Sequence, residues 1–337
     1  MRSVYFRWVG IAVCLLAGGS TVQAEVRAFF TNQQAHTVTV VDTRSLETLA
    51  EIKVGKEPAG VTTSDKWNRV WITAPGEGAV YEIDCSSLLV TRKLSVGEGP
   101  LAVISDDFND MLYVADWYLH EIIAIDLHDF EPVKHIPVGK SPSGFGLDSK
   151  NRKLYVSNRD DNSITEIDLK ALTTGRAAAT GERPFGITLD GDGQRLYSAN
   201  VASNTVTVID TDSMKPVAEI DVGDRPYDVT LASKEQYLFV SNQYDNNVSI
   251  IDTETLETVK LLDVGDYPEG IDTHPNDTDV YVANWFDNTV SVIDALAQTV
   301  TDTIDAADGT RAYGDMFSSG CNTKGTVIPT AAGQKNG

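Results

Sequence analysis

Short runs of alternating apolar and polar residues recur along the whole chain, and each run ends on an aspartate or a similar turn residue. Runs such as VTVVD, VTVID and VSVID have the period of two that is typical of a half-buried β-strand. The closing aspartates lie 42 residues apart, at Asp42, Asp84, Asp126, Asp168, Asp210, Asp252 and Asp294. Seven copies without an insertion predict a closed repeat protein.

Two further series share this interval. The first is a Gly-x-x-Pro turn, with glycine at Gly55, Gly97, Gly139, Gly181, Gly223 and Gly265 and proline at Pro58, Pro100, Pro142, Pro184, Pro226 and Pro268. The second runs through Asn32, Ala74, Asp116, Asn158, Asn200, Asn242 and Asn284. Proline fixes φ, glycine tolerates a positive φ, and short carboxylates and amides accept turn N–H groups, so we interpret all three series as structural.

One repeat contains four short β-rich runs separated by turn residues. From Gly223 it reads GDRP, YDVTLA, SKEQ, YLFVSN, QYDN, NVSIID, TETLE and TVKLLDV. A helical period of useful length is missing throughout. Repeats of four antiparallel strands predict an all-β protein, a seven-bladed β-propeller of 42-residue blades, rather than a solenoid.

The two ends of the chain predict how the ring closes. After its leader, the chain begins directly with a second strand at Ala28–Thr31, so the first blade lacks its inner strand. The C-terminal segment Ala312–Phe317 resembles the inner strand Pro184–Leu189 and supplies the missing one. Closure of this kind removes open sheet edges, which are aggregation hazards.

Several strands carry a recognisable signature. The chain contains YVSN at Tyr155–Asn158, YVAN at Tyr281–Asn284 and NTVSVID at Asn288–Asp294. It therefore resembles the YVTN-family β-propellers, which are bacterial periplasmic or secreted proteins. The resemblance implies the fold and leaves the function open, because such propellers include binding and surface proteins as well as lactonases, lyases and dehydrogenase subunits.

The N-terminus has the layout of a secretory signal peptide over residues 1–24, with Arg2 and Arg7, an apolar stretch and a small-residue end at Ala24. We expect the propeller at residues 25–321, a disordered tail at residues 322–337, and no transmembrane segment. The mature protein is then periplasmic or secreted.

The net charge limits the classes of partner, and the cysteines indicate the compartment. The net charge of −22 argues against nucleic acid as a partner. Cys85 follows the third strand of the second blade, and Cys321 follows the closing strand of the first, so both emerge on one face of neighbouring blades. We predict a disulfide between them in an oxidising compartment.

Inner-strand alternation places small residues in the central channel, which we expect to be narrow and water-filled. Asp228 and Asp272 face this channel. They could hold a cation there, and solvated carboxylates are the simpler interpretation. His36 and His120 occupy equivalent loops two blades apart, too far for a shared metal ion, so no metal site is predicted.

One rim carries the residues that differ most between repeats. It comprises the Gly-x-x-Pro turns and the loops between second and third strands, and it holds Trp117, Tyr118, Arg159, Arg183, Phe185, Arg225, Tyr227, Tyr244, Trp285 and Phe286. Aromatic and arginine side chains dominate interface energetics, so we expect a binding surface here, with scattered exposed loop aromatics as the alternative.

No catalytic motif such as GxSxG, HExxH or CxxC occurs, and no cofactor is predicted. We therefore expect an exported, monomeric, non-catalytic scaffold that binds a protein partner or a small ligand on this rim, accessory to an envelope redox system. The alternative is a propeller enzyme or enzyme subunit, a lactonase, a lyase or a periplasmic dehydrogenase chain, for which Asp228, Asp272, Glu269 and Arg225 are candidates. A structural surface protein is a third hypothesis.

Overall fold

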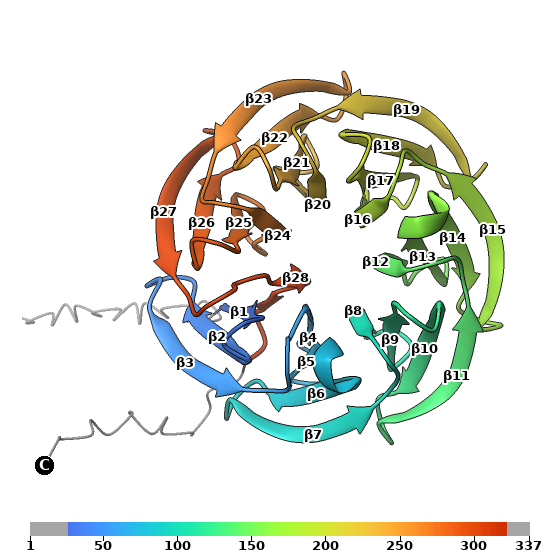
Figure 1. The fold of residues 1–337 in the computed structure, drawn as a ribbon, viewed down its shortest axis with the longest axis vertical. Coiled ribbons are helices and arrows are strands. Elements are labelled where there is room, and N and C mark those ends of the chain that lie inside the picture. Colours follow the sequence, from blue (N-terminus) through green and yellow to red (C-terminus); the bar gives the residue numbers. More distant parts are fainter. Residues whose placement is uncertain (1–25, 322–337) are drawn as a thin grey trace, which may run out of the picture.

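The computed structural model describes residues 26–321, which form a ring of seven β-sheets around a central axis (Figure 1). In each blade an inner strand begins near the axis and an outer strand runs around the circumference. The predicted all-β seven-bladed propeller is confirmed. The predicted signal peptide at residues 1–24 and the predicted tail at residues 322–337 lie outside the described residues.

The strands follow chain order within each blade. The first two blades contain β1 (Arg27–Asn32), β2 (Thr37–Asp42), β3 (Thr48–Lys53) and β29 (Phe317–Ser318), then β4 (Gly60–Ser64), β5 (Arg69–Ala74), β6 (Ala79–Asp84), β7 (Leu89–Ser95) and β28 (Tyr313–Gly314). The third and fourth contain β8 (Pro100–Asp106), β9 (Met111–Asp116), β10 (Glu121–Asp126), β11 (Glu131–Pro137), β12 (Pro142–Asp148), β13 (Lys153–Asn158), β14 (Ser163–Asp168) and β15 (Thr173–Ala179).

The remaining blades repeat the pattern. They contain β16 (Pro184–Leu189), β17 (Arg195–Asn200), β18 (Thr205–Asp210), β19 (Lys215–Asp221), β20 (Pro226–Ala232), β21 (Tyr237–Asn242), β22 (Asn247–Asp252), β23 (Glu257–Asp263), β24 (Pro268–Thr273), β25 (Asp279–Asn284), β26 (Thr289–Asp294) and β27 (Thr299–Asp305). Two 3₁₀ turns, η1 (Pro75–Glu77) and η2 (Arg159–Asp161), follow β5 and β13. Within residues 26–321, no helix has the length and apolarity needed to span a membrane.

The second strand of each blade carries an aromatic residue that fills the space between blades. These side chains recur at the 42-residue interval and are almost fully buried: Phe29, Trp71, Tyr113, Tyr155, Tyr197, Phe239 and Tyr281. Each supplies a large apolar surface that packs against the neighbouring sheet. This series, which the sequence analysis did not single out, therefore forms much of the inter-blade core.

Hydroxyl groups link neighbouring blades close to the axis. Thr73 Oγ1 donates to the Leu101 carbonyl oxygen at 2.7 Å, and Ser157 Oγ donates to that of Phe185 at 2.6 Å. Each bond joins the second strand of one blade to the inner strand of the next. Buried bonds of this kind contribute roughly 1 kcal/mol each to stability.

The first blade closes with the C-terminal segment, as predicted, but by an interrupted strand. The Ala312 amide donates to Thr31 Oγ1 at 2.9 Å. In the next blade the Gly60 amide makes the equivalent hydrogen bond to Thr73 Oγ1. The segment then leaves the blade: β28 pairs in parallel with β4, and only β29 returns to pair with β1. Gly314 makes this detour with φ of 112°. Figure 1 shows β28 reaching into the centre of the ring.

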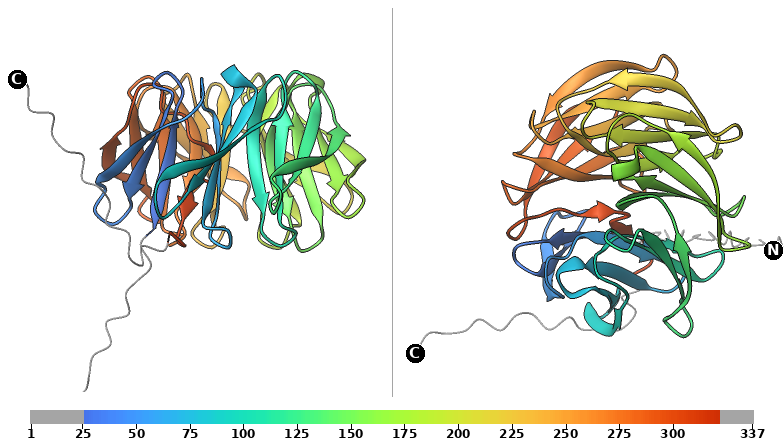
Figure 2. Two further views of the ribbon diagram at one scale, coloured as in Figure 1. Left: turned by 90° about the horizontal axis from the view of Figure 1, so that it is seen from below. Right: turned by 45° about the vertical axis from the view of Figure 1, so that its right-hand side comes forward.

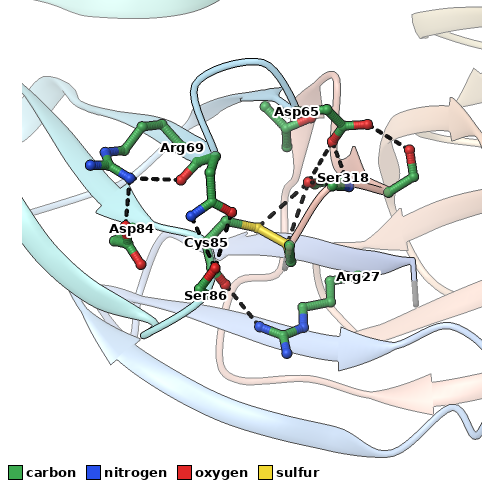
Figure 3. The surroundings of a disulfide bond; sticks show 12 residues. Arg27, Asp65, Arg69, Asp84, Cys85, Ser86 and Ser318 are labelled. Atoms are coloured by element: carbon green, nitrogen blue, oxygen red, sulfur yellow. Dashed lines mark hydrogen bonds and ion pairs between the residues drawn. A yellow bond between two sulfur atoms is a disulfide. The ribbon is translucent and has the colours of Figure 1, made fainter. Parts of the chain in front are cut away.

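The predicted disulfide joins Cys85 to Cys321, whose Cα atoms lie 5.1 Å apart (Figure 3). Asp65 holds the residues just before it, because its carboxylate accepts bonds from the Ser318 and Ser319 hydroxyls and from the Gly320 amide at 2.6 to 2.8 Å. The end of the described chain is thus fixed on the second blade. The side view in Figure 2 shows the sheets standing next to one another, with the turns between their strands on the two flat faces of the ring.

The aspartate and asparagine series stabilise turns, as predicted. Asp252 Oδ1, for example, accepts the amides of Glu254 and Thr255, and these bonds lower the pKa of Asp252. Asn200 Nδ2 donates to the Thr205 and Thr207 hydroxyls at 3.0 and 2.8 Å.

The glycines of the Gly-x-x-Pro turns do not have the positive φ that we expected. The residue directly before the proline has it instead, for instance Arg183, Arg225 and Tyr267 at 55 to 60°. Glycine is required because a larger residue would clash with a neighbouring side chain: a Cβ on Gly139 would lie 2.6 Å from Asn158 Cγ.

Candidate functional site

The rim face is the side of the ring that carries the Gly-x-x-Pro turns and the loops between second and third strands. Three aromatic side chains on it are more than half exposed: Tyr118 at 65 %, Tyr244 at 54 % and Phe286 at 61 %. Exposed large aromatics are costly to hydrate and are enriched in binding surfaces.

Blades six and seven contribute one group of aromatics to this face. Tyr267 lies at its centre, with ring centroids 5.8 Å from Tyr244, 5.9 Å from Trp285 and 4.9 Å from Phe286. The Arg225 guanidinium lies 4.6 Å from the Tyr244 ring centroid and donates to its hydroxyl at 3.3 Å. Four predicted rim residues, Arg225, Tyr244, Trp285 and Phe286, are therefore brought together.

Blades three to five contribute a second group. The Arg159 guanidinium lies 5.5 Å from the Trp117 ring centroid and pairs with Asp160 at 2.6 Å. The Arg183 side chain is exposed on the adjacent turn, and its charge helps to lower the pKa of Asp160 against the opposing effect of burial. Arg159 and Arg183 thus lie on the predicted face, but separately from Arg225 and its aromatic neighbours.

A pocket of about 210 Å³ opens on the rim face between the second and fifth blades. We call it the mouth pocket; its lining residues are Pro75, Gly99, Leu101, Trp117, Tyr118, Phe185 and Arg311. Three of these, Trp117, Tyr118 and Phe185, belong to the predicted rim set. Arg311, on the closing segment, was not predicted to contribute.

Arg311 is held by buried partners. Its Nε lies 3.0 Å from Glu269 Oε2, and its Nη2 bonds the Tyr227 hydroxyl. Gln243 Nε2 donates to Glu269 Oε1 at 3.0 Å, so the carboxylate is held from both sides. Burial raises the pKa of Glu269, although the positive charge of Arg311 opposes the shift. Glu269 in turn raises the pKa of Arg311 despite its burial, so the guanidinium remains charged.

One sequence signal could have identified this pair. Glu269 and Arg311 are 42 residues apart, which makes them equivalent positions of neighbouring blades. Opposite charges at equivalent buried positions predict an ion pair between blades. Arg311 lies one residue before Ala312–Phe317, the segment predicted to close the first blade.

An aromatic plug closes the channel just below the rim face. The Phe185 ring centroid lies 4.2 Å from that of Tyr227 and 5.2 Å from that of Tyr313, and all three side chains are buried. Phe185 and Tyr227 therefore lie inside the ring rather than on its surface. The expected water-filled channel is interrupted at this level, because the detour of the closing segment brings Tyr313 onto the axis.

Below the plug the channel widens into a cavity of about 340 Å³. Its wall includes the predicted Asp228 and Asp272, and also Asp315 from the closing segment. Burial raises the pKa of Asp228 to about 7, and it raises the pKa values of Asp272 and Asp315, which also repel one another. The cavity therefore favours the protonated form of its carboxyl groups.

The histidines have turn roles. His36 Nδ1 accepts the Glu57 amide and His120 Nδ1 accepts the Ser141 amide, both at 3.1 Å. Asn204 fills the same position two blades further on and accepts the Arg225 amide. Within residues 26–321, no group of three or more His, Cys, Asp or Glu side chains has an arrangement that could hold a metal ion.

Comparison with known proteins agrees with this fold. Residues 145–236 match the sequence model of the YNCE-like beta-propeller family. This match and the seven blades fit the YVTN-type seven-bladed propeller that the repeats predict. A comparison with curated proteins gives no match.

Several solved structures share the architecture. Kuenenia stuttgartiensis hydrazine synthase is 20 % identical over 75 % of this chain and 87 % of that chain, with a TM-score of 0.69. A functionally unknown protein from Desulfotomaculum acetoxidans is 12 % identical over 86 % of this chain and 100 % of that chain, with a TM-score of 0.72. Dihydro-heme d1 dehydrogenase NirN is 14 % identical over 90 % of this chain and 77 % of that chain, with a TM-score of 0.66. At these identities the likeness establishes the fold alone.

Proposed function

We propose that this chain is an exported, non-catalytic propeller that binds a partner on its rim face as an accessory to an envelope redox system. The observation that carries the proposal is the exposure of Tyr118, Tyr244 and Phe286 on one face, beside arginines of a strongly acidic protein. Aromatic and arginine side chains in such patches supply most of the binding energy of protein interfaces.

Two further observations are compatible with this role. A disulfide fits an oxidising compartment outside the cytosol, either periplasmic or extracellular. Of the similar structures, NirN is a dehydrogenase by its title, and so a redox enzyme, and another is a hydrazine synthase. The partner itself is defined only by the surface it must match.

The test is affinity capture from the native cell envelope with the tagged mature chain, followed by mass spectrometry. A triple variant, Tyr118→Ala, Tyr244→Ala and Phe286→Ala, removes exposed rings without touching the core. We expect at least a tenfold loss of the captured partner. The matched control is Phe108→Ala, which removes a ring that is 71 % exposed in a loop on the opposite face.

Two results would contradict the proposal. If the triple variant captures as much partner as the wild type, the partner does not bind on the rim face. Turnover of a substrate by the isolated chain would overturn the non-catalytic role.

The second candidate is a propeller enzyme or enzyme subunit, and one observation favours it. Asp228, with its pKa raised to about 7, is protonated or ionised with similar ease at neutral pH, as a general acid or base must be. An enzyme of this kind would lose its turnover with Asp228→Asn while keeping its fold. The same substitution should leave partner capture unchanged if the rim face is the functional surface.

A further inference from the structure

The mouth pocket has the size of a single substituted ring. Its volume is about 210 Å³, whereas a dry cavity of about 150 Å³ is large enough to bind benzene. The pocket is open to the rim face, so a ligand can enter without movement of the blades. A ring with one polar substituent therefore fits, and a larger cofactor does not.

The walls of the pocket are suited to a flat ring. Trp117 and Phe185, with ring centroids 6.2 Å apart, line it together with the exposed ring of Tyr118. Leu101 adds apolar surface, and aromatic side chains favour offset or edge contacts with another ring. These contacts favour an aromatic ligand over an aliphatic one of equal size.

One wall of the pocket is cationic. The Glu269 carboxylate lies 3.0 Å from Nε of Arg311 as an ion pair, and Nη2 donates to the Tyr227 hydroxyl, so the guanidinium is held in one orientation. Among residues 26–321, the only hydrogen bond of the Arg311 side chain is the one from Nη2 to Tyr227, its buried Nε makes none, and Arg311 lines the pocket. A guanidinium that is held on one edge and open on the other can receive an anionic oxygen.

We propose that the mouth pocket binds one aromatic ring bearing an anionic oxygen, with the ring between Trp117, Tyr118 and Phe185 and the oxygen on Arg311. The inference rests on the proposed binding role of the rim face and names its ligand chemistry. Two sources supply this chemistry: a free aromatic acid, or a partner chain that ends in an aromatic residue with its terminal carboxylate.

The experiment is isothermal titration of the mature protein with four probes at pH 7. Benzoate represents the free acid, and N-acetyl-Ala-Phe represents the chain terminus. Benzyl alcohol lacks the charge and cyclohexanecarboxylate lacks the flat ring. We expect saturable binding of at least one aromatic carboxylate with one site per chain. It should bind at least tenfold more tightly than either comparison compound, because hydrogen bonds to charged groups are the stronger ones.

Two variants assign the binding to the pocket. Leu101→Trp fills the pocket and leaves the ion pair of Arg311 intact, and we expect affinity for the aromatic carboxylate to fall at least tenfold. The double variant Glu269→Gln with Arg311→Gln removes the guanidinium without leaving a lone buried charge. It should abolish the preference for benzoate over benzyl alcohol. Should the double variant fail to fold, the effect of Leu101→Trp alone decides whether the aromatic carboxylate binds in the mouth pocket. Phe108→Ala, on the opposite face, is the control and should bind as the wild type does.

The outcomes separate this inference from the broader proposal. The tighter of the two aromatic carboxylates identifies the source of the ligand. Absence of saturable binding by both, or binding that Leu101→Trp leaves unchanged, overturns the pocket assignment, even where partner capture by the rim succeeds. Carboxylate binding together with failed partner capture would uphold the pocket and reject the protein-docking role.

Discussion

Glycine at the start of the fourth to seventh blades is explained by the asparagine that it touches. At Gly223 an added Cβ would lie 2.6 Å from Asn242 Nδ2 and 2.8 Å from an Asp245 carboxylate oxygen. Asn242 itself is bonded to Asn247 and Ser249 at 2.8 Å, so it cannot move away without losing those bonds. The turn therefore accepts no side chain at this position.

We predict that Gly223→Ala lowers the free energy of unfolding by about 1 to 3 kcal/mol, the usual cost of overpacking. Chemical denaturation followed by circular dichroism measures it. The matched control is Gly175→Ala in an outer strand, where the nearest atoms lie 3.2 Å or further from the added Cβ. The control should change stability by less than about 0.5 kcal/mol. Equal effects of the two substitutions would refute the close-contact explanation.

The sequence predicted where these turns lie but not the reason for each residue. A periodic glycine indicates a special backbone position, and either a positive φ or a close contact satisfies that requirement. The distinction depends on Asn158 or Asn242 at the end of the second strand of the same blade, whose distance to the glycine is set by the completed blade. The positive φ falls instead on Arg183, Arg225 and Tyr267, which the sequence does not mark as special.

The closing segment is the element on which the ring depends. It joins the first blade at Ala312 and again at β29, and it crosses the axis between these points. The pairing of both termini could be predicted, because the first blade lacks an inner strand. The interruption could not, since it requires Tyr313 to pack on Phe185 and Tyr227 from distant blades.

The disulfide fixes this element from its far end. It closes a loop of 236 residues, for which the chain-entropy model gives a stabilisation of about 5 kcal/mol, and measured values are commonly about 2 to 4 kcal/mol. We predict that replacing both cysteines, Cys85→Ser with Cys321→Ser, lowers the free energy of unfolding by about 2 to 4 kcal/mol in urea. A matched measurement adds reductant to the wild-type protein, which should reproduce the loss. A double variant as stable as the oxidised protein would show that the bonds of Asp65 to Ser318 and Gly320 suffice.

At the scale of the whole ring, sequence and structure differ most in the channel. The alternation of the inner strands correctly placed Asp228 and Asp272 on the axis. Asp315 was missed because it belongs to the part of the closing segment whose path departs from the repeat, and Arg311 lies just before the predicted closing strand, which began at Ala312. The mouth pocket likewise combines side chains of the second, third and fifth blades with Arg311, and no single repeat contains that information.

The channel carboxylates predict an unusual dependence of stability on pH. Asp228 and Asp272 come from blades six and seven, and Asp315 from the closing segment; Thr62 donates to Asp315, and Glu269 adds negative charge near Asp228. All three carboxyl groups have raised pKa values in the folded protein, so the folded state binds more protons than the unfolded state. Their contribution to stability is therefore fully present below about pH 4 and is lost as the pH rises through about 7.

We predict that the wild-type protein loses stability, on the order of 2 kcal/mol, between pH 6 and pH 8.5. This window lies above the range where Glu82 and Glu166, whose pKa values are lowered by their arginine partners against the effect of burial, become protonated and destabilise the fold. Asp315→Asn removes one carboxylate from the cavity, so it should raise stability at pH 8.5 and flatten the dependence. Asp305→Asn removes the same charge from an exposed outer strand and should leave the slope unchanged. Urea unfolding at several pH values measures both, and equal slopes in the wild type and Asp315→Asn would show that the three carboxylates do not share their protons across the channel.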